Sequence, residues 1–164
     1  MTSVLNVSST EYANQAANPP VLANPSLNTS KLRIMPVTWA IGTAASTGST
    51  GLLARMPQGK CTIWTGISKL YNSAWATTTT AAIGTGAYLT QVSANPPTTV
   101  AAATGAFRAA ATLHTAGSFN LDTVDLYGLQ TFFSHTGFDV TLTTAAEALG
   151  GTETLQGYIA YSVD

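Results

Sequence analysis

The fold is decided by a stretch near the C-terminus, which reads Thr154-Leu155-Gln156-Gly157-Tyr158-Ile159-Ala160-Tyr161-Ser162-Val163. Its residues alternate with a period of two, the period at which successive side chains of a β-strand point to opposite faces. We therefore expect a terminal but well-paired strand whose inner face carries Leu155, Ile159, Tyr161 and Val163. A slip of one residue would turn all four toward water, so the register of this strand should be strongly specified.

Similar but shorter patterns recur along the chain from Lys31 onward. Val37, Trp39 and Ile41 alternate with small residues, and Pro36 places that strand at an edge or at its start, because proline donates no ladder hydrogen bond. Short strands that are separated by turn residues, without alternating helices, are typical of β-sandwiches and barrels. The predicted fold is therefore all-β, a β-sandwich or jelly-roll-like domain with an extended N-terminal arm.

Three segments are harder to assign. The alanine-rich residues 98–112 would fit a short helix, although Gly105 weakens that interpretation. Residues 144–147 match a helix capping box, which fits one helical turn or an ordered loop. Gly84 lies in a Gly-Thr-Gly triplet that lacks the other residues of a phosphate loop, so we expect a bulge or a close strand approach.

The chain divides into two regions, an arm over residues 1–30 and a single β-rich domain over residues 31–164. The arm contains three of the prolines and has apolar residues without any period. Ordering such a segment costs about 1–2 kcal/mol per residue in backbone entropy, which it cannot recover by burying itself. We expect the arm to become ordered against another subunit through Tyr12, Leu22 and Leu27, and the alternative is that it packs on its own domain.

The chain is poor in charge. Charged residues make up 8% of the sequence and the net charge is −1, against about 25% charged residues in an ordinary soluble domain. Depletion of charge is a property of surfaces that face other subunits, so we predict a homo-oligomer or a larger assembly. Nucleic-acid binding is not expected, because the six cations form no cluster that could neutralise phosphates.

The sequence also lacks the marks of membrane insertion and of catalysis. No stretch approaches the roughly 18 apolar residues of a membrane span, and the N-terminus has no signal-peptide pattern. His135 and Asp139 occur without a nucleophile elbow, and Asp122 and Asp125 offer too few oxygens for calcium. Cys61 is the sole cysteine and is expected to be a buried structural thiol. We predict neither enzymatic activity, nor a metal site, nor a cofactor.

Aromatic residues are the remaining candidates for a binding role. They would form a sugar platform if exposed, but at strand spacing they are more often core or interface anchors; the set comprises Trp39, Trp64, Tyr71, Trp75 and Tyr88. Trp64 is out of phase with Cys61 and Ile63, so it should point away from the core. Trp64 therefore joins Tyr12, Leu22 and Leu27 as a predicted subunit-interface residue.

Four segments carry a resemblance to a known class of protein: LRIMPVT at 32–38, LLARMP at 52–57, KCTIW at 60–64, and TLQGYIAY at 154–161. They look like small virion proteins of tailed bacteriophages. The low charge and the proline-broken arm are similar to those of capsid decoration, or cement, proteins.

The resemblance covers about residues 31 to 90 and 126 to 164, and it involves no invariant motif, so it assigns no functional residues. It implies a β-sandwich or jelly-roll-like domain that is made in the host cytoplasm and lies in many copies on the capsid surface. Its partners would be the major capsid protein and copies of itself, and it would stabilise the phage head shell. The alternative is a tail or fibre component with a glycan-binding role.

Overall fold

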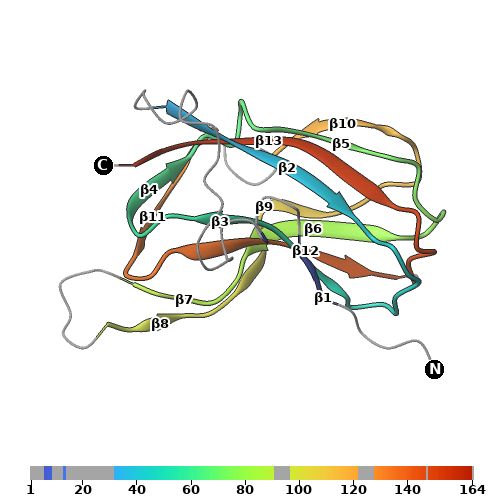
Figure 1. The fold of residues 1–164 in the computed structure, drawn as a ribbon, viewed down its shortest axis with the longest axis horizontal. Helices are drawn as coiled ribbons and strands as arrows, with labels where there is room; N and C mark the ends of the chain where they lie inside the picture. Colours follow the sequence, from blue (N-terminus) through green and yellow to red (C-terminus); the bar gives the residue numbers. More distant parts are fainter. Residues whose placement is uncertain are drawn as a thin grey trace.

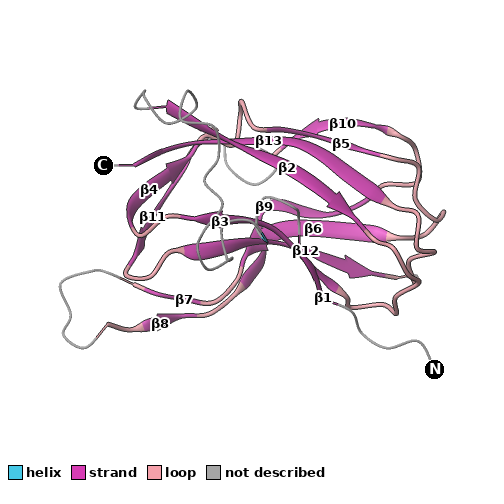
Figure 2. Cartoon of the chain, in the orientation of Figure 1, coloured by secondary structure: helices cyan, strands magenta, loops and turns pink. Residues whose placement is uncertain are grey.

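The structure is a computed structural model, and it describes residues 6–8, 13, 32–90, 97–121, 128–146 and 148–163 (Figure 2). Three of the predicted interface residues, Tyr12, Leu22 and Leu27, lie outside the described residues. So do Asp122 and Asp125, the two carboxylates that were weighed as calcium ligands.

Within these described residues the named elements are thirteen β-strands: β1 (Asn6–Ser8), β2 (Leu32–Ala40), β3 (Thr50–Met56), β4 (Gly59–Ile63), β5 (Lys69–Asn72), β6 (Thr80–Thr85), β7 (Tyr88–Leu89), β8 (Thr99–Val100), β9 (Ala103–Thr112), β10 (Gly117–Asn120), β11 (Gln130–Ser134), β12 (Phe138–Ala145) and β13 (Thr154–Val163). The predicted all-β fold class is therefore confirmed.

The strands form two large sheets and one hairpin. Sheet A has the order β1-β3-β12-β6-β9, and sheet B has the order β10-β5-β13-β4-β11, with β2 paired to the other side of β13. Strands β7 and β8 pair with each other. Figure 1 shows the two sheets as the layers of a sandwich, with the β7–β8 hairpin extending from one end.

Strand β13 organises sheet B. It pairs with β2 from Thr154 to Ser162, and on its other side with β5 and then β4. Among the described strands, β2 pairs with β13 alone, which agrees with the edge position predicted from Pro36. The long C-terminal strand is thus well paired, as its sequence period predicts.

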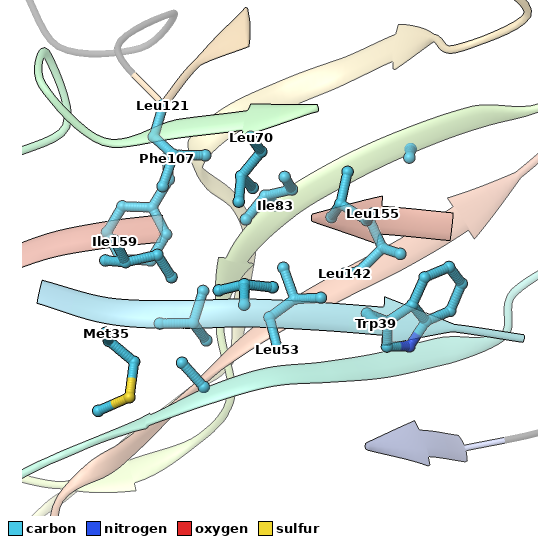
Figure 3. Packing of buried hydrophobic residues seen from close by; sticks show 14 of the residues in the cluster. Met35, Trp39, Leu53, Leu70, Ile83, Phe107, Leu121, Leu142, Leu155 and Ile159 are labelled. Carbon is cyan, nitrogen blue, oxygen red and sulfur yellow. The ribbon is translucent and has the colours of Figure 1, made fainter. Parts of the chain in front are cut away.

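The core lies between the two layers, as Figure 3 shows for its larger side chains. Leu155 and Ile159 of β13 are fully buried, Tyr161 is buried, and Val163 is half-buried against the core. Trp39 of β2 is also buried, and its ring centroid lies 5.8 Å from that of Trp75. The predicted inner face of β13 is therefore confirmed.

Two local predictions need correction. Residues 99–100 and 103–112 form strands rather than a helix, because β9 pairs with β6 and buries Phe107 completely. Tertiary pairing here outweighs the helix propensity of alanine. Residues 144–146 likewise do not form a helical turn: β12 runs through Ala145, and Ala146 follows with a φ of 72°.

The expectation for Gly84 is confirmed. A Cβ at this position would collide with the backbone oxygen of Ala103 on β9, so only glycine allows β6 and β9 to approach this closely.

Part of the N-terminal arm belongs to sheet A. Strand β1 runs parallel to β3, with Asn6 to Ser8 beside Thr50 to Leu52. These three residues therefore pair with their own chain. Whether the arm contacts another subunit stays a prediction.

Candidate association surface

Among the described residues, the large hydrophobic side chains that remain exposed are gathered on one side of the sandwich. All eight come from the strands of sheet B or from residues beside them: Leu32, Ile34, Trp64, Ile67, Tyr71, Leu129, Phe133 and Tyr158. None of them belongs to the side chains that the structure describes on sheet A. Apolar side chains concentrated on one face, rather than scattered singly, are typical of interaction sites.

The strand register shows how four of these side chains come together, and hydrogen bonds to β13 place a fifth, Trp64, beside them. Residues directly opposite one another on neighbouring strands project to the same face. Leu32 lies opposite Ser162, Ile34 opposite Ala160, and Tyr158 opposite both Pro36 and Lys69. Tyr71 lies opposite Gln156, and is therefore diagonal to Tyr158. We call Leu32, Ile34, Trp64, Tyr71 and Tyr158 the outer patch.

Trp64 is fixed to β13 by a set of hydrogen bonds. Its backbone N–H donates to the Ala160 oxygen at 2.9 Å, and its indole Nε1 donates to Ser162 Oγ at 3.2 Å. Ser68 Oγ donates to the Trp64 oxygen at 2.7 Å and accepts from the Ala160 N–H at 2.9 Å. The turn that presents Trp64 is therefore tied to the central strand at several points.

The prediction that Trp64 points away from the core is confirmed. Its side chain is 37% exposed, whereas Cys61 and Ile63 are fully buried. Other members of the aromatic set fall elsewhere: Trp39 and Trp75 are buried, and Tyr88 packs beside Phe138 at 5.5 Å between ring centroids. A platform made of all five aromatic residues is therefore excluded.

Hydroxyl and amide groups lie around the outer patch. Thr62 and Thr131 share a hydrogen bond of 2.9 Å between their hydroxyl oxygens, and Asn120 Nδ2 donates to the Gly66 oxygen at 3.2 Å. Lys60 and Lys69 project to the same face, since Lys60 is two residues from Thr62 and Lys69 is opposite Tyr158. Among the described residues of this face there is no carboxylate.

The two described carboxylates are both engaged in other parts of the structure. Asp139 accepts a hydrogen bond from Arg55 Nη1 at 2.8 Å, and the same guanidinium donates to the Thr136 oxygen. Glu153 is 3% exposed, and its carboxylate accepts from the N–H groups of Gly150, Gly151 and Thr152 at 2.7 to 3.0 Å. The Glu153 carboxylate thus stabilises the loop before β13, whereas the Asp139 carboxylate pairs with Arg55 across β12 and β3.

The groups weighed for chemistry are dispersed. Burial raises the pKa of the Cys61 thiol to about 12, against a smaller opposing effect of Arg33, so the nucleophilic thiolate is disfavoured. His135 is exposed, and the Asp139 carboxylate is bound by Arg55. Within the described ranges, no three histidine, cysteine or acidic residues gather as metal ligands, and no helix has the length and apolarity to cross a membrane.

Sequence reasoning found Trp64 but missed most of the outer patch. Tyr158 belongs to the outer face of β13 in the predicted alternation, yet nothing in that strand alone shows which residues surround it. Leu32 and Ile34 share a face of β2 with Pro36 and Thr38. The alternation of Leu32 and Ile34 with Met35 and Val37 was the sequence signal that could have assigned them to the outer face.

Comparisons with known proteins give one distant similarity of fold. No family model and no curated protein sequence matches the chain. A chain in the structure of infectious bursal disease virus, Gt strain, is similar over 82% of this chain, with 13% sequence identity and a TM-score of 0.46. The similar region makes up 32% of the length of that viral chain. At this identity and TM-score, the likeness assigns no function.

Proposed function

We propose that this protein is a structural virion protein, a capsid decoration protein that binds the major capsid protein and stabilises the phage head shell. One observation carries the proposal. The exposed large hydrophobic side chains of the described residues gather on or beside the strands of sheet B, whose backbone is already hydrogen-bonded.

The outer patch suits association because its backbone is ordered before binding. Burial of apolar surface contributes about 25 cal/mol per Å². Loops that must order on binding lose part of this gain as entropy, whereas side chains on a paired sheet lose less. Trp64 is tied to β13 and resembles an anchor residue, since tryptophan and tyrosine are enriched at interface hot spots.

Stabilisation of a shell then follows from mass action. A protein that binds the assembled shell, and not its separated subunits, shifts the equilibrium toward the assembled state. The low charge of the chain, 8% of residues, fits a protein whose surface is largely shared with other subunits. Self-association and the contribution of the N-terminal arm remain parts of this proposal.

The second candidate is a glycan-binding tail or fibre component. Trp64, Tyr71 and Tyr158 place three exposed aromatic rings on one face, beside hydroxyl and amide groups that could hydrogen-bond a sugar. Leu32 and Ile34 weigh against it, since aliphatic side chains offer no flat ring on which a sugar can stack. We therefore rank association with protein subunits first.

The proposal is tested by copy number and by shell stability. Quantitative mass spectrometry of purified particles should find hundreds of copies, and shells that lack the protein should disassemble at a lower temperature until it is added back. A few tens of copies located at the tail would favour the second candidate. Failure of the protein to bind purified shells would refute the decoration role.

A truncation tests the arm separately. Removal of residues 1–28 should leave the β-sandwich folded, although it deletes β1 and its pairing with β3. We expect the truncated protein to bind shells more weakly. Circular dichroism would show that it is folded, and a co-sedimentation assay would measure its binding to shells. Equal binding by the truncated and full-length proteins would show that the arm is not a contact.

A further inference from the structure

We infer that the outer patch docks on a different protein, whose surface is apolar at its centre and carries a carboxylate placed opposite Lys69. This inference rests on the proposed function and names the chemistry of the partner surface. It follows from where the basic residues of this face lie relative to the apolar ones.

Lys69 lies beside two residues of the outer patch. It lies directly opposite Tyr158 on β13, and Tyr71 follows it by two residues on the same face of β5. On its other side it lies opposite Asn120 of β10. A partner that covers Tyr71 and Tyr158 therefore covers Lys69 as well.

Covering a lysine has an energetic consequence. Removing an ammonium group from water is unfavourable unless an acceptor, preferably an anion, replaces the lost hydration. No described residue on this face offers a carboxylate, and the carboxylates of Asp139 and Glu153 are held by Arg55 and by backbone N–H groups. Since the described residues of this face offer no carboxylate, we expect the partner to supply the anion.

The same charges disfavour a second copy of this face as the partner. A two-fold interface brings the same patch from both subunits together. It would bring Lys69 of both copies into one interface in which no described residue supplies an anion, and like charges across an interface are strongly unfavourable. Lys69 therefore favours a heterologous contact, such as an acidic site on a shell subunit.

The experiment measures binding of purified protein to shells that lack it, at low and at high salt. We expect Lys69→Glu to weaken binding at least ten-fold at low salt and Lys69→Gln to weaken it less, with wild-type binding falling as salt increases. Tyr158→Ser should weaken binding at every salt concentration. Thr112→Glu is the control matched in net charge to Lys69→Gln, because each variant lowers the net charge by one, and Thr112 is an exposed site on β9 of sheet A.

Each outcome decides a different point. Thermal unfolding of every variant separates loss of contact from loss of fold. If wild-type protein binds shells and Lys69→Glu binds equally well, the inference is wrong and the decoration role stands. Analytical sedimentation of the free wild-type protein and of Tyr158→Ser supplies the other check. If the wild-type protein is an oligomer and Tyr158→Ser is a monomer, a second copy occupies the outer patch and the inference is wrong. No binding by the wild-type protein would overturn both the decoration role and the inference.

Discussion

Gly157→Ala is the sharpest test of how β13 organises the sandwich. Gly157 lies opposite Leu70 of β5 and has a φ of 149°, a backbone conformation that side chains rarely adopt. A Cβ here would collide with the backbone oxygen of Lys69 and lie 2.9 Å from the Cα of Leu70. Both contacts involve backbone, so β5 would have to move away from β13.

The cost has two parts. Holding alanine in a glycine conformation costs about 1–3 kcal/mol, and overpacking costs about 1–3 kcal/mol. We therefore expect a loss of about 2–6 kcal/mol from the free energy of unfolding, which is a large fraction of the total of about 5–15 kcal/mol for a domain. For a chain of this size each kcal/mol lowers Tm by about 2–4 °C.

The assay is urea and thermal unfolding followed by circular dichroism, with Gly42→Ala as the control. A Cβ at Gly42 meets nothing within 4 Å, so this variant should be neutral, or more stable by up to about 1 kcal/mol through the unfolded state. If the stabilities of Gly157→Ala and Gly42→Ala agree within about 1 kcal/mol, the expected cost of glycine replacement is wrong. The close pairing of β13 with β5 would then be wrong too.

Three further outcomes are expected. Ile159→Ala should lower the free energy of unfolding by about 2–5 kcal/mol in urea titrations, since Ile159 is fully buried. Burial raises the pKa of Glu153, but its backbone N–H donors lower it more, so the folded pKa lies below 4.5. The stabilisation from this carboxylate is therefore present above pH 4.5 and lost as pH falls through the folded pKa. Glu153→Gln should cost about 1–3 kcal/mol at neutral pH and show a weaker loss of Tm in acid, and equal acid dependence in both proteins would contradict this. Cys61, with a thiol pKa of about 12, should resist thiol reagents until the protein unfolds, so rapid labelling of the folded protein would show that it is not buried.

The features that the sequence predicted well depend on one strand at a time. The period of two in residues 154–163 predicts which side chains of β13 enter the core, because alternation is a local property of an extended backbone. Trp64 was assigned to the outer face for the same reason, from its phase relative to Cys61 and Ile63. Neither prediction required knowledge of which strand lies beside which.

The predictions that failed required long-range information. Residues 103–112 form a strand because β6 pairs with them and because Phe107 is buried in the core, and neither fact can be read from an alanine-rich segment. The outer patch is a stronger case. Leu32 and Tyr158 lie far apart in the sequence, and only the register of β2 with β13 places them on one face.

The position of Tyr158 explains why the outer patch indicates a covered face. Leu32, Ile34 and Tyr158 lie on β2 and β13, in a layer whose inner face is already filled by Met35, Leu155 and Ile159. The core gains nothing from apolar side chains on the outer face, and exposed apolar surface promotes non-specific association. Charged side chains on this face would oppose such association, and the only ones among its described residues are lysines. A sequence selected only for folding would have no physical reason to keep these side chains apolar, whereas a sequence that must bind another subunit would. Substitution of Tyr158 by serine should therefore leave stability almost unchanged while weakening association.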